Sequence, residues 1–394
     1  MAATLKTFPR QNYDGVAVAV PVTIPYKRYS TQTAHWWIAR ALKALADGAG
    51  IKPQDIDGLS ISSFSLAPDT AIGLTQHLGL SPRWLDYVPM GGASGLLALR
   101  KAARAVQSGD CTFAACVAGD TNHVDSFRRM LSTFSRFAQD AVYPYGSGGP
   151  NASFALIMSH YMQRTGATRE DCGKLAVAQR TNALRFPHAL FKSPLTLGQY
   201  MDARPIADPI HLFDCVMPCA GAEAFLVMRD DVARQLKVPH ARVLSTIERH
   251  NAYADDAIQW RGGWGIDIGE LYAMAGIKPE AVDFVQTYDD YPVISMMQLE
   301  DLGLCAKGEG PSFVRANTFT FDGTCPHNTS GGQLSVGQAG CAGGYLGLVE
   351  AVRQLTGTAL GGQVTDPKVG LVSGFGMITY DRGLASAAAL LGKA

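Results

Sequence analysis

Residues 91–118 read GGASGLLALRKAARAVQSGDCTFAACVA, and this stretch decides the fold class. A Gly-rich turn leads into an amphipathic helical pattern over Ala93–Gln107, and the short apolar run at Phe113–Ala118 is typical of a buried strand. The same alternation recurs along the chain and predicts an α/β protein. Further buried strands are expected at Gly15–Val20, Gly58–Ser63, Ala152–Met158, Ala224–Met228, Phe284–Thr287 and Val369–Ser373. Further helices are expected at Thr33–Ala46, Val293–Leu302 and Gly344–Leu355.

One short pattern occurs twice. GIKP stands at Gly50–Pro53 and again at Gly276–Pro279, each time after a helical segment and before acidic residues and a strand. A duplicated βα unit explains this repeat. We therefore expect two similar halves, residues 1–240 and 241–394. Residues 121–210, approximately, are richer in polar and aromatic side chains and are expected to form an insertion over the face of the first half.

The composition limits the classes of function. The chain has 394 residues, of which 47% are hydrophobic, so it is long enough to bury a large core. Lys+Arg and Asp+Glu both number 34, and this balance argues against a nucleic-acid or anionic-membrane partner. The 8 cysteines form no paired CxxC knuckles, so we expect no metal site and buried thiols in a reducing cytoplasm. Neither a signal peptide nor a membrane-spanning apolar run of about 20 residues is expected.

Four motifs follow one another along nearly the whole chain. They are the Gly91–Gly95 turn with its helix, the segment Leu195–Cys215 that contains RPIADPIHLFDC, NTSGGQLSVG at Asn328–Gly337, and SGFG at Ser373–Gly376. Their order and wording resemble the thiolase superfamily, specifically its sterol-carrier or lipid-transfer type. The resemblance implies a thiolase fold, in which two βαβαβαββ halves pack as αβαβα layers, usually in a dimer.

The positions that carry thiolase chemistry depart from the family. Thiolases have a nucleophilic Cys where this chain has Gly92, and glycine cannot take up an acyl group. Gly337-Gln338-Ala339 stands where thiolases have Gly-His-Pro. Tyr288-Asp289-Asp290-Tyr291 stands where the sterol-carrier type has His-Asp-Cys-Phe. The surrounding loops are well formed, so the pattern indicates replacement of the catalytic groups rather than their erosion.

A change of substrate accounts for the missing Cys. Cleaving the Cα–Cβ bond of a β-ketoacyl-CoA produces an acyl group that a nucleophile must carry. If Cβ carries a hydroxyl, cleavage is a retro-aldol reaction that needs a base for the hydroxyl, stabilisation of the thioester enolate and an acid for Cα. Superfamily members that lack the Cys act in this way on steroid side chains.

The resemblance to these aldolases implies products and partners. It implies a retro-aldolase that acts on a steroid or bile-acid side chain and releases a ketone and a short acyl-CoA such as propionyl-CoA. It also implies a homodimer that joins a small OB-fold and zinc-ribbon partner in a heterotetramer. We expect no cofactor other than the CoA of the substrate.

The motif positions nominate the site residues. The candidate catalytic side chains are Tyr288, Tyr291, Tyr345, Asp290 and His327. The backbone amides of Gly92 and Gly376 are expected to stabilise the enolate, and the substrate loops are expected to contain Ser94, Asn328, Gln338 and Phe375. Tyr288 or Tyr291 is the candidate base for the hydroxyl. A tyrosine base needs a pKa below its ordinary value of ~10, and ionised neighbours at Asp289 and Asp290 would oppose this. At least one of the two aspartates is therefore expected to be structural or to be the base itself.

Alternatives remain at these positions. The three tyrosines are alternatively core aromatic residues whose hydroxyls have hydrogen-bond partners. Asp289 is alternatively the N-cap of the helix that begins at Pro292. Two other functions compete with the aldolase. One is a non-catalytic acyl-CoA or lipid-binding subunit, and the other is a thiolase with a relocated nucleophile at Cys325 or Cys341.

Overall fold

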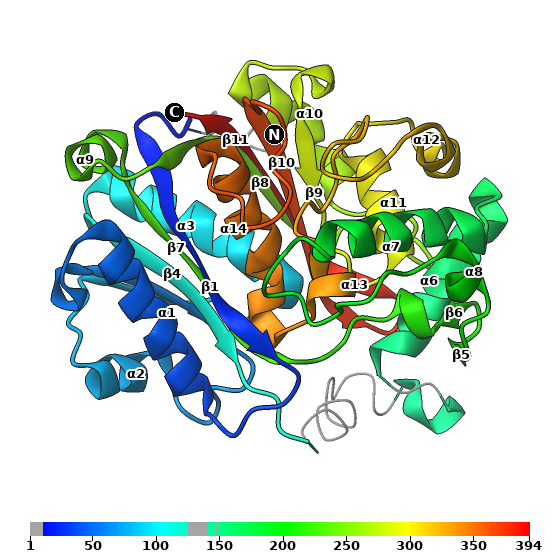
Figure 1. Cartoon of the computed structure of the whole chain (residues 1–394), viewed down its shortest axis with the longest axis horizontal. Helices are drawn as coiled ribbons and strands as arrows, with labels where there is room; N and C mark the ends of the chain where they lie inside the picture. Colours follow the sequence, from blue (N-terminus) through cyan, green and yellow to red (C-terminus); the bar gives the residue numbers. More distant parts are fainter. Residues whose placement is uncertain (1–10, 125–140, 147–148) are drawn as a thin grey trace, which may run out of the picture.

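The computed structural model describes residues 11–124, 141–146 and 149–394 (Figure 1). These residues form a nine-stranded mixed sheet with the order β3-β2-β4-β7-β1-β8-β11-β10-β9. The strands are β1 Val16–Lys27, β2 Gly58–Ser62, β3 Trp84–Tyr87, β4 Ala114–Asp120, β7 Ala220–Arg229, β8 His240–His250, β9 Phe284–Gln286, β10 Val369–Thr379 and β11 Arg382–Lys393. The predicted α/β class is confirmed.

The strand order repeats from the two edges of the sheet toward its centre. The first half reads β2-β4-β7-β1 behind the edge strand β3, and the second half reads β9-β10-β11-β8. Antiparallel pairing of β1 with β8 joins the two halves, with Ala17 opposite Arg242. The two GIKP sequences precede β2 and β9, which hold equivalent places in the halves. The duplication that this repeat predicts is therefore visible in the sheet.

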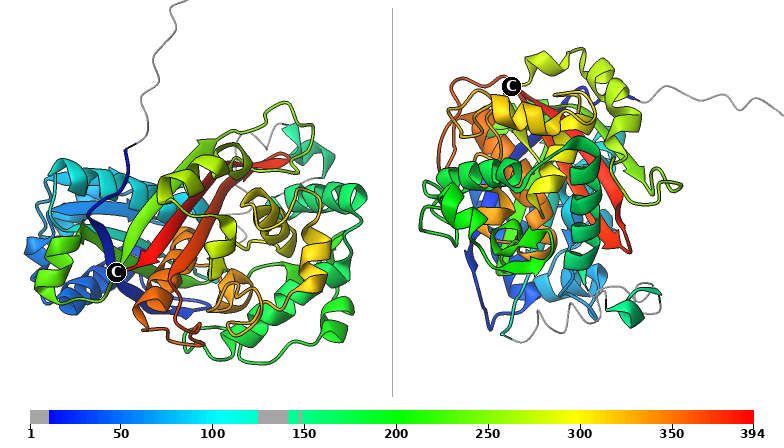
Figure 2. Two further views of the ribbon diagram at one scale, coloured as in Figure 1. Left: turned by 90° about the horizontal axis from the view of Figure 1, so that it is seen from above. Right: turned by 90° about the vertical axis from the view of Figure 1, so that its right-hand side faces the viewer.

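Two helices form the central layer (Figures 1 and 2). Helix α3 (Ser94–Ser108) and helix α14 (Gly343–Thr356) contact each other and strands of both halves. Glycines allow this close approach, because a Cβ on Gly344 would lie only 2.9 Å from the Cα of Gly92. Helix α1 (Ala34–Ala49) covers the outer face of the first half, and α10 (Trp264–Ala275) covers that of the second. The layers thus follow the predicted αβαβα order.

The insertion packs differently from what the sequence predicts. Its described part joins the core cluster of the second half, where Phe154 meets Tyr291 and Phe375. The expected position over the first half is therefore wrong, and residues 125–140 and 147–148 of the insertion lie outside the described residues. The strand expected at Ala152–Met158 is also wrong, since this run lies in helix α6 (Pro150–Thr165). A short apolar run does not distinguish a strand from a buried helix, and Pro150 at the first helical position favours the helix.

The remaining α-helices of the described chain surround these layers. They are α2 Ala71–Leu78, α7 Arg169–Ala183, α8 Leu197–Met201, α9 Asp230–Leu236, α11 Pro292–Asp301, α12 Gly310–Ala316 and α13 Gly332–Val336. A two-stranded sheet within the insertion pairs β5 (Pro205–Ala207) with β6 (Ile210–His211). Across the described ranges, the helices are too short or too polar to cross a membrane.

Candidate active site

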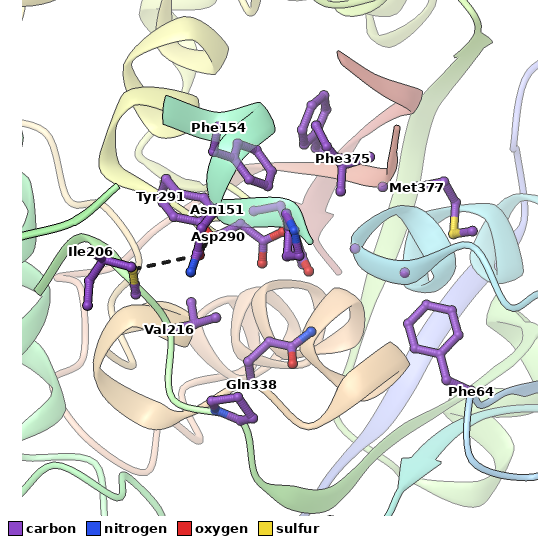
Figure 3. Close-up of a pocket in the computed structure, with 18 residues that line it drawn as sticks. Phe64, Asn151, Phe154, Ile206, Val216, Asp290, Tyr291, Gln338, Phe375 and Met377 are labelled. Carbon is purple, nitrogen blue, oxygen red and sulfur yellow. Dashed lines mark hydrogen bonds between the residues drawn. The ribbon is translucent and has the colours of Figure 1, made fainter. Parts of the chain in front are cut away.

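A cavity of about 240 Å³ lies where the two halves and the insertion meet (Figure 3). Its lining includes seven of the predicted site residues: Gly92, Tyr288, Asp290, Tyr291, Gln338, Phe375 and Gly376. Apolar side chains such as Phe64, Phe154 and Ile206 provide most of the remaining wall. The structure thus brings together residues from both duplicated halves, as a shared catalytic site requires.

Tyr288 occupies the space that a side chain at position 92 would need. A Cβ built on Gly92 would overlap the ring atoms Cε2 and Cζ of Tyr288 and the backbone oxygen of Phe375. Real Cβ atoms do not approach other atoms this closely, so the phenol ring and a cysteine at position 92 exclude each other here. The absence of the thiolase nucleophile and the presence of Tyr288 are therefore two parts of one change.

Asp290 is the carboxyl group of this cavity. Burial raises its pKa to about 7, and its interaction with the Tyr288 hydroxyl acts in the opposite direction. A carboxyl group with a pKa near neutrality is suited to accept a proton at physiological pH. Burial and Asp290 raise the pKa of Tyr288 well above its ordinary value, although the Gln338 side chain opposes this. Tyr288 is therefore protonated at neutral pH and can act as a donor, and Asp290 is the member of this pair whose pKa suits proton acceptance.

Tyr291 lies beside the insertion. Its hydroxyl donates a hydrogen bond to Asn151 Oδ1, and its ring packs against Phe154 at a centroid distance of 4.1 Å. Burial, Cys215 and Asp290 raise the pKa of Tyr291 well above its ordinary value. The direction of both shifts disfavours Tyr288 and Tyr291 as the base, because that role needs a lowered pKa.

Asp289 has a structural task, although it adjoins Asp290 in the sequence. Its carboxylate accepts hydrogen bonds from the backbone N–H groups of Gln333 (2.9 Å) and Leu334 (3.1 Å) and from Gln179 Nε2 (2.8 Å). Asp289 therefore stabilises the first turn of α13. The alternative that it caps the helix at Pro292 is wrong, because α11 follows Tyr291 without a side-chain cap.

Three other predicted residues support loops outside the cavity lining. His327 Nε2 lies 2.7 Å from Thr287 Oγ1, and burial lowers the pKa of this imidazole to about 3. Asn328 Oδ1 accepts a hydrogen bond from the backbone N–H of Thr287 (2.9 Å). Ser94 Oγ accepts one from the backbone N–H of Met90 (2.9 Å). An uncharged, buried His327 has no route to a substrate, so its catalytic assignment is not retained.

Tyr345 is a core residue rather than a cavity residue. Its hydroxyl lies 3.0 Å from Ser62 Oγ, and its fully buried ring packs against Phe225 at a centroid distance of 5.4 Å. The predicted catalytic role of Tyr345 depends on its place after a Gly-rich loop, but the helix turns the side chain into the core.

A Tyr345→Phe variant tests this correction. We expect kcat to stay within about threefold of wild type, because the hydroxyl is remote from the cavity lining. The free energy of unfolding should fall by about 1 kcal/mol, since Ser62 loses a buried hydrogen-bond partner. Urea denaturation and steady-state assays measure the two quantities. A loss of ~10² in kcat, typical of a general acid or base, would restore Tyr345 to the catalytic site.

Sequence reasoning missed the contribution of the insertion. Asn151, Phe154 and Ile206 of the insertion line the cavity, as do Cys215 and Val216 just after it, and Asn151 bonds to Tyr291 across a separation of 140 residues. A Gly-Pro-Asn helix start at Gly149–Asn151 is the local signal, but it does not reveal which distant loop the helix faces.

The fold and the position of the cavity define the class of protein. Residues 269–386 match the family described as thiolase C-terminal domain-like. The structure of human mitochondrial 3-ketoacyl-CoA thiolase superposes with a TM-score of 0.68 at 15% identity, covering 97% of this chain and 99% of that chain. These findings show that the chain has the thiolase fold.

Closer relatives define the branch. The chain is 32% identical over 344 residues to a steroid side-chain-cleaving aldolase of Thermomonospora curvata, covering 82% of this chain and 86% of that protein. It is 31% identical over 337 residues to the 17-hydroxy-3-oxo-4-pregnene-20-carboxyl-CoA lyase of Mycobacterium tuberculosis, covering 81% and 85%. The structure of an Ltp2-ChsH2(DUF35) aldolase matches with a TM-score of 0.81 at 26% identity, covering 96% and 98%. The chain belongs to the branch of the thiolase superfamily that includes these aldolases, and the resemblance stated from the motifs is confirmed.

Proposed function

We propose that this protein is a retro-aldolase that cleaves the Cα–Cβ bond of a β-hydroxyacyl-CoA on a steroid side chain. The products are a ketone and a short acyl-CoA such as propionyl-CoA. One observation carries the proposal: the Tyr288 ring fills the place of the thiolase nucleophile, while Asp290, with a pKa of about 7, lies in the same cavity. The site has lost the group that acyl transfer needs and has a base for a hydroxyl instead.

The residues divide the reaction between them. Ionised Asp290 removes the proton from the Cβ hydroxyl, the oxygen electrons form the ketone, and the Cα–Cβ bond breaks. Its electron pair passes into the thioester enolate, whose oxygen is stabilised by the backbone N–H groups of Gly92 and Gly376. The Tyr288 hydroxyl then protonates Cα and recovers its proton from Asp290, with which it interacts. Since one proton moves from oxygen to carbon overall, the balance needs no cofactor beyond the CoA of the substrate.

The two competing functions are less well supported. Cys341 is fully buried in the core, and Cys325 lies in a separate groove with Phe284 and Phe313. Cys215 does line the cavity, but burial raises the pKa of its thiol to about 12, so it forms little thiolate at neutral pH. A relocated nucleophile is therefore disfavoured. A purely binding subunit has no need for a buried carboxyl beside a phenol in its cavity.

We also propose a homodimer that joins a small OB-fold and zinc-ribbon partner in a heterotetramer, acting in the cytoplasm. The name of the structural neighbour pairs Ltp2 with ChsH2(DUF35), which supports a two-protein complex. Light scattering of the purified chain together with such a partner checks the assembly. A chain that is monomeric and fully active alone would contradict it.

A mass-spectrometric assay tests the reaction. The CoA thioester named for the M. tuberculosis relative is incubated with the chain, with and without a DUF35 partner. We expect an equimolar ketone and short acyl-CoA, and we expect alkylating reagents to leave the rate unchanged. Substrate that binds without turnover would favour the binding subunit, and inactivation by alkylation would favour a relocated cysteine.

A further inference from the structure

Asn151 is the polar group that helix α6 brings to the cavity. It is the second residue of this helix, after Pro150, and both residues line the cavity wall. Its Oδ1 accepts the hydrogen bond from the Tyr291 hydroxyl, and Cys215 Sγ lies 4.0 Å from the same oxygen. Figure 3 shows Asn151 and Asp290 together in the middle of the cavity. Because Oδ1 is committed to Tyr291, the amide has a defined orientation.

The two N–H groups of Asn151 Nδ2 can donate hydrogen bonds. Within the described part of the chain, Asn151 makes hydrogen bonds only through Oδ1, and no protein acceptor engages its Nδ2. The first backbone N–H groups of α6 also lack partners inside the helix, and they carry the positive end of its dipole. This part of the cavity therefore favours an oxygen that bears or develops negative charge.

We propose that Asn151 Nδ2 donates a hydrogen bond to the oxygen on Cβ of the substrate, which Asp290 deprotonates and which becomes the ketone oxygen. This inference rests on the proposed retro-aldol function. A hydroxyl that donates to Asp290 needs a donor for its own lone pairs, and Asn151 of helix α6 lines the same cavity and supplies that donor. The insertion thus provides the part of the site that recognises the leaving ketone, while Gly92 and Gly376 serve the acyl half.

The same arrangement defines the substrate class. An acyl-CoA with hydrogen in place of the Cβ oxygen leaves both the Asn151 donor and the Asp290 acceptor unpaired in a largely apolar cavity. Sites built around a substrate hydroxyl reject analogues that lack it for this reason. We therefore expect the 17-deoxy thioester to bind less tightly than the 17-hydroxy thioester.

An Asn151→Asp variant isolates the donor. It keeps the side-chain volume and the acceptor for Tyr291, but it replaces the N–H donor by a carboxylate oxygen and adds a negative charge. Asn151→Ala, which removes the donor without adding charge, is therefore measured beside it. We expect kcat/KM for the 17-hydroxy thioester to fall about 10- to 100-fold, the typical effect of one lost hydrogen bond to a developing charge. The rate is measured on the high-pH plateau, where Asp290 is ionised in both proteins. Binding of the 17-deoxy thioester, which lacks the oxygen, should change less than about threefold.

Two results would overturn the inference. If Asn151 only holds Tyr291 in place, the Asp variant keeps full plateau activity and Tyr291→Phe loses it. If Asn151 only maintains the fold, binding of the 17-deoxy thioester falls together with kcat/KM. If the Asp variant does not fold, Asn151→Ala is compared with Tyr291→Phe. Both remove the Tyr291–Asn151 bond, but only Asn151→Ala removes the donor, so equal losses in the two variants would contradict the inference. A wild-type protein that cleaves no 17-hydroxy thioester would instead reject the proposed function itself.

Discussion

An Asp290→Asn variant is expected to lower kcat by about 10²- to 10⁴-fold, the usual contribution of a general base. The amide keeps the size and the polarity of the side chain, but it cannot accept the hydroxyl proton. The pH profile adds a second expectation. Burial raises the pKa of Asp290 to about 7, so wild-type activity should rise as the pH increases through that value and Asp290 ionises. The residual activity of the variant should lack this rise.

Asp289 provides a matched control for this experiment. It is the adjacent carboxyl, its side chain is more deeply buried than that of Asp290, and burial raises its pKa to about 7 as well. Its bonds to α13, however, make it a structural group. Asp289→Asn should therefore lower thermal stability and keep the rise of activity with pH. If the rise disappears in Asp289→Asn and persists in Asp290→Asn, the assignment of the base is wrong.

The sequence predicts those residues of the candidate site that belong to recognisable motifs. Gly92 and the Tyr288–Tyr291 segment differ from the family pattern at known catalytic positions, and both were found in the cavity. The sequence does not predict the protonation states of these side chains, because these depend on burial and on neighbours that only the tertiary structure defines. Ionised carboxylates beside a tyrosine would oppose its use as a base, whereas the raised pKa of Asp290 makes this carboxyl the proposed base.

The structure differs from the sequence-based predictions where local sequence patterns are ambiguous. Tyr345 follows a Gly-rich loop that resembles a site loop, yet the rotation of α14 directs its ring toward Phe225 in the core. The run Ala152–Met158 has no period that separates a buried strand from a buried helix. The placement of the insertion depends on its polar and aromatic composition, which does not show which half it contacts, so Asn151 is not recognisable as a cavity residue. Contacts between segments that are distant in the sequence determine where these side chains lie. A single sequence does not show which segments make these contacts.

The geometry around Gly92 also explains why the thiolase reaction is not simply one substitution away. Two obstacles surround a new side chain at this position: the ring of Tyr288 and the backbone oxygen of Phe375. The ring is able to move by rotation about its side-chain bonds, but the backbone oxygen belongs to strand β10 and is held by its pairing with β11. Movement of the Tyr288 ring therefore leaves the clash between the new Cβ and the Phe375 backbone oxygen in place.

A Gly92→Cys variant is accordingly expected to lose aldolase activity by at least about 10²-fold, since the new side chain displaces Tyr288 and distorts an enolate-binding amide. Overpacking should lower the free energy of unfolding by about 1–3 kcal/mol. Gly92→Ala should show the same two losses, because the obstacle is the Cβ and not the thiol. Adding Tyr288→Ala to Gly92→Cys should recover part of the stability, but it should not produce β-ketoacyl-CoA cleavage, because Gln338 stands where thiolases have histidine. Urea denaturation and product analysis with both substrate types check these outcomes. A stable Gly92→Cys protein that cleaves β-ketoacyl-CoA would show that the loss of cysteine alone separates this chain from the thiolases.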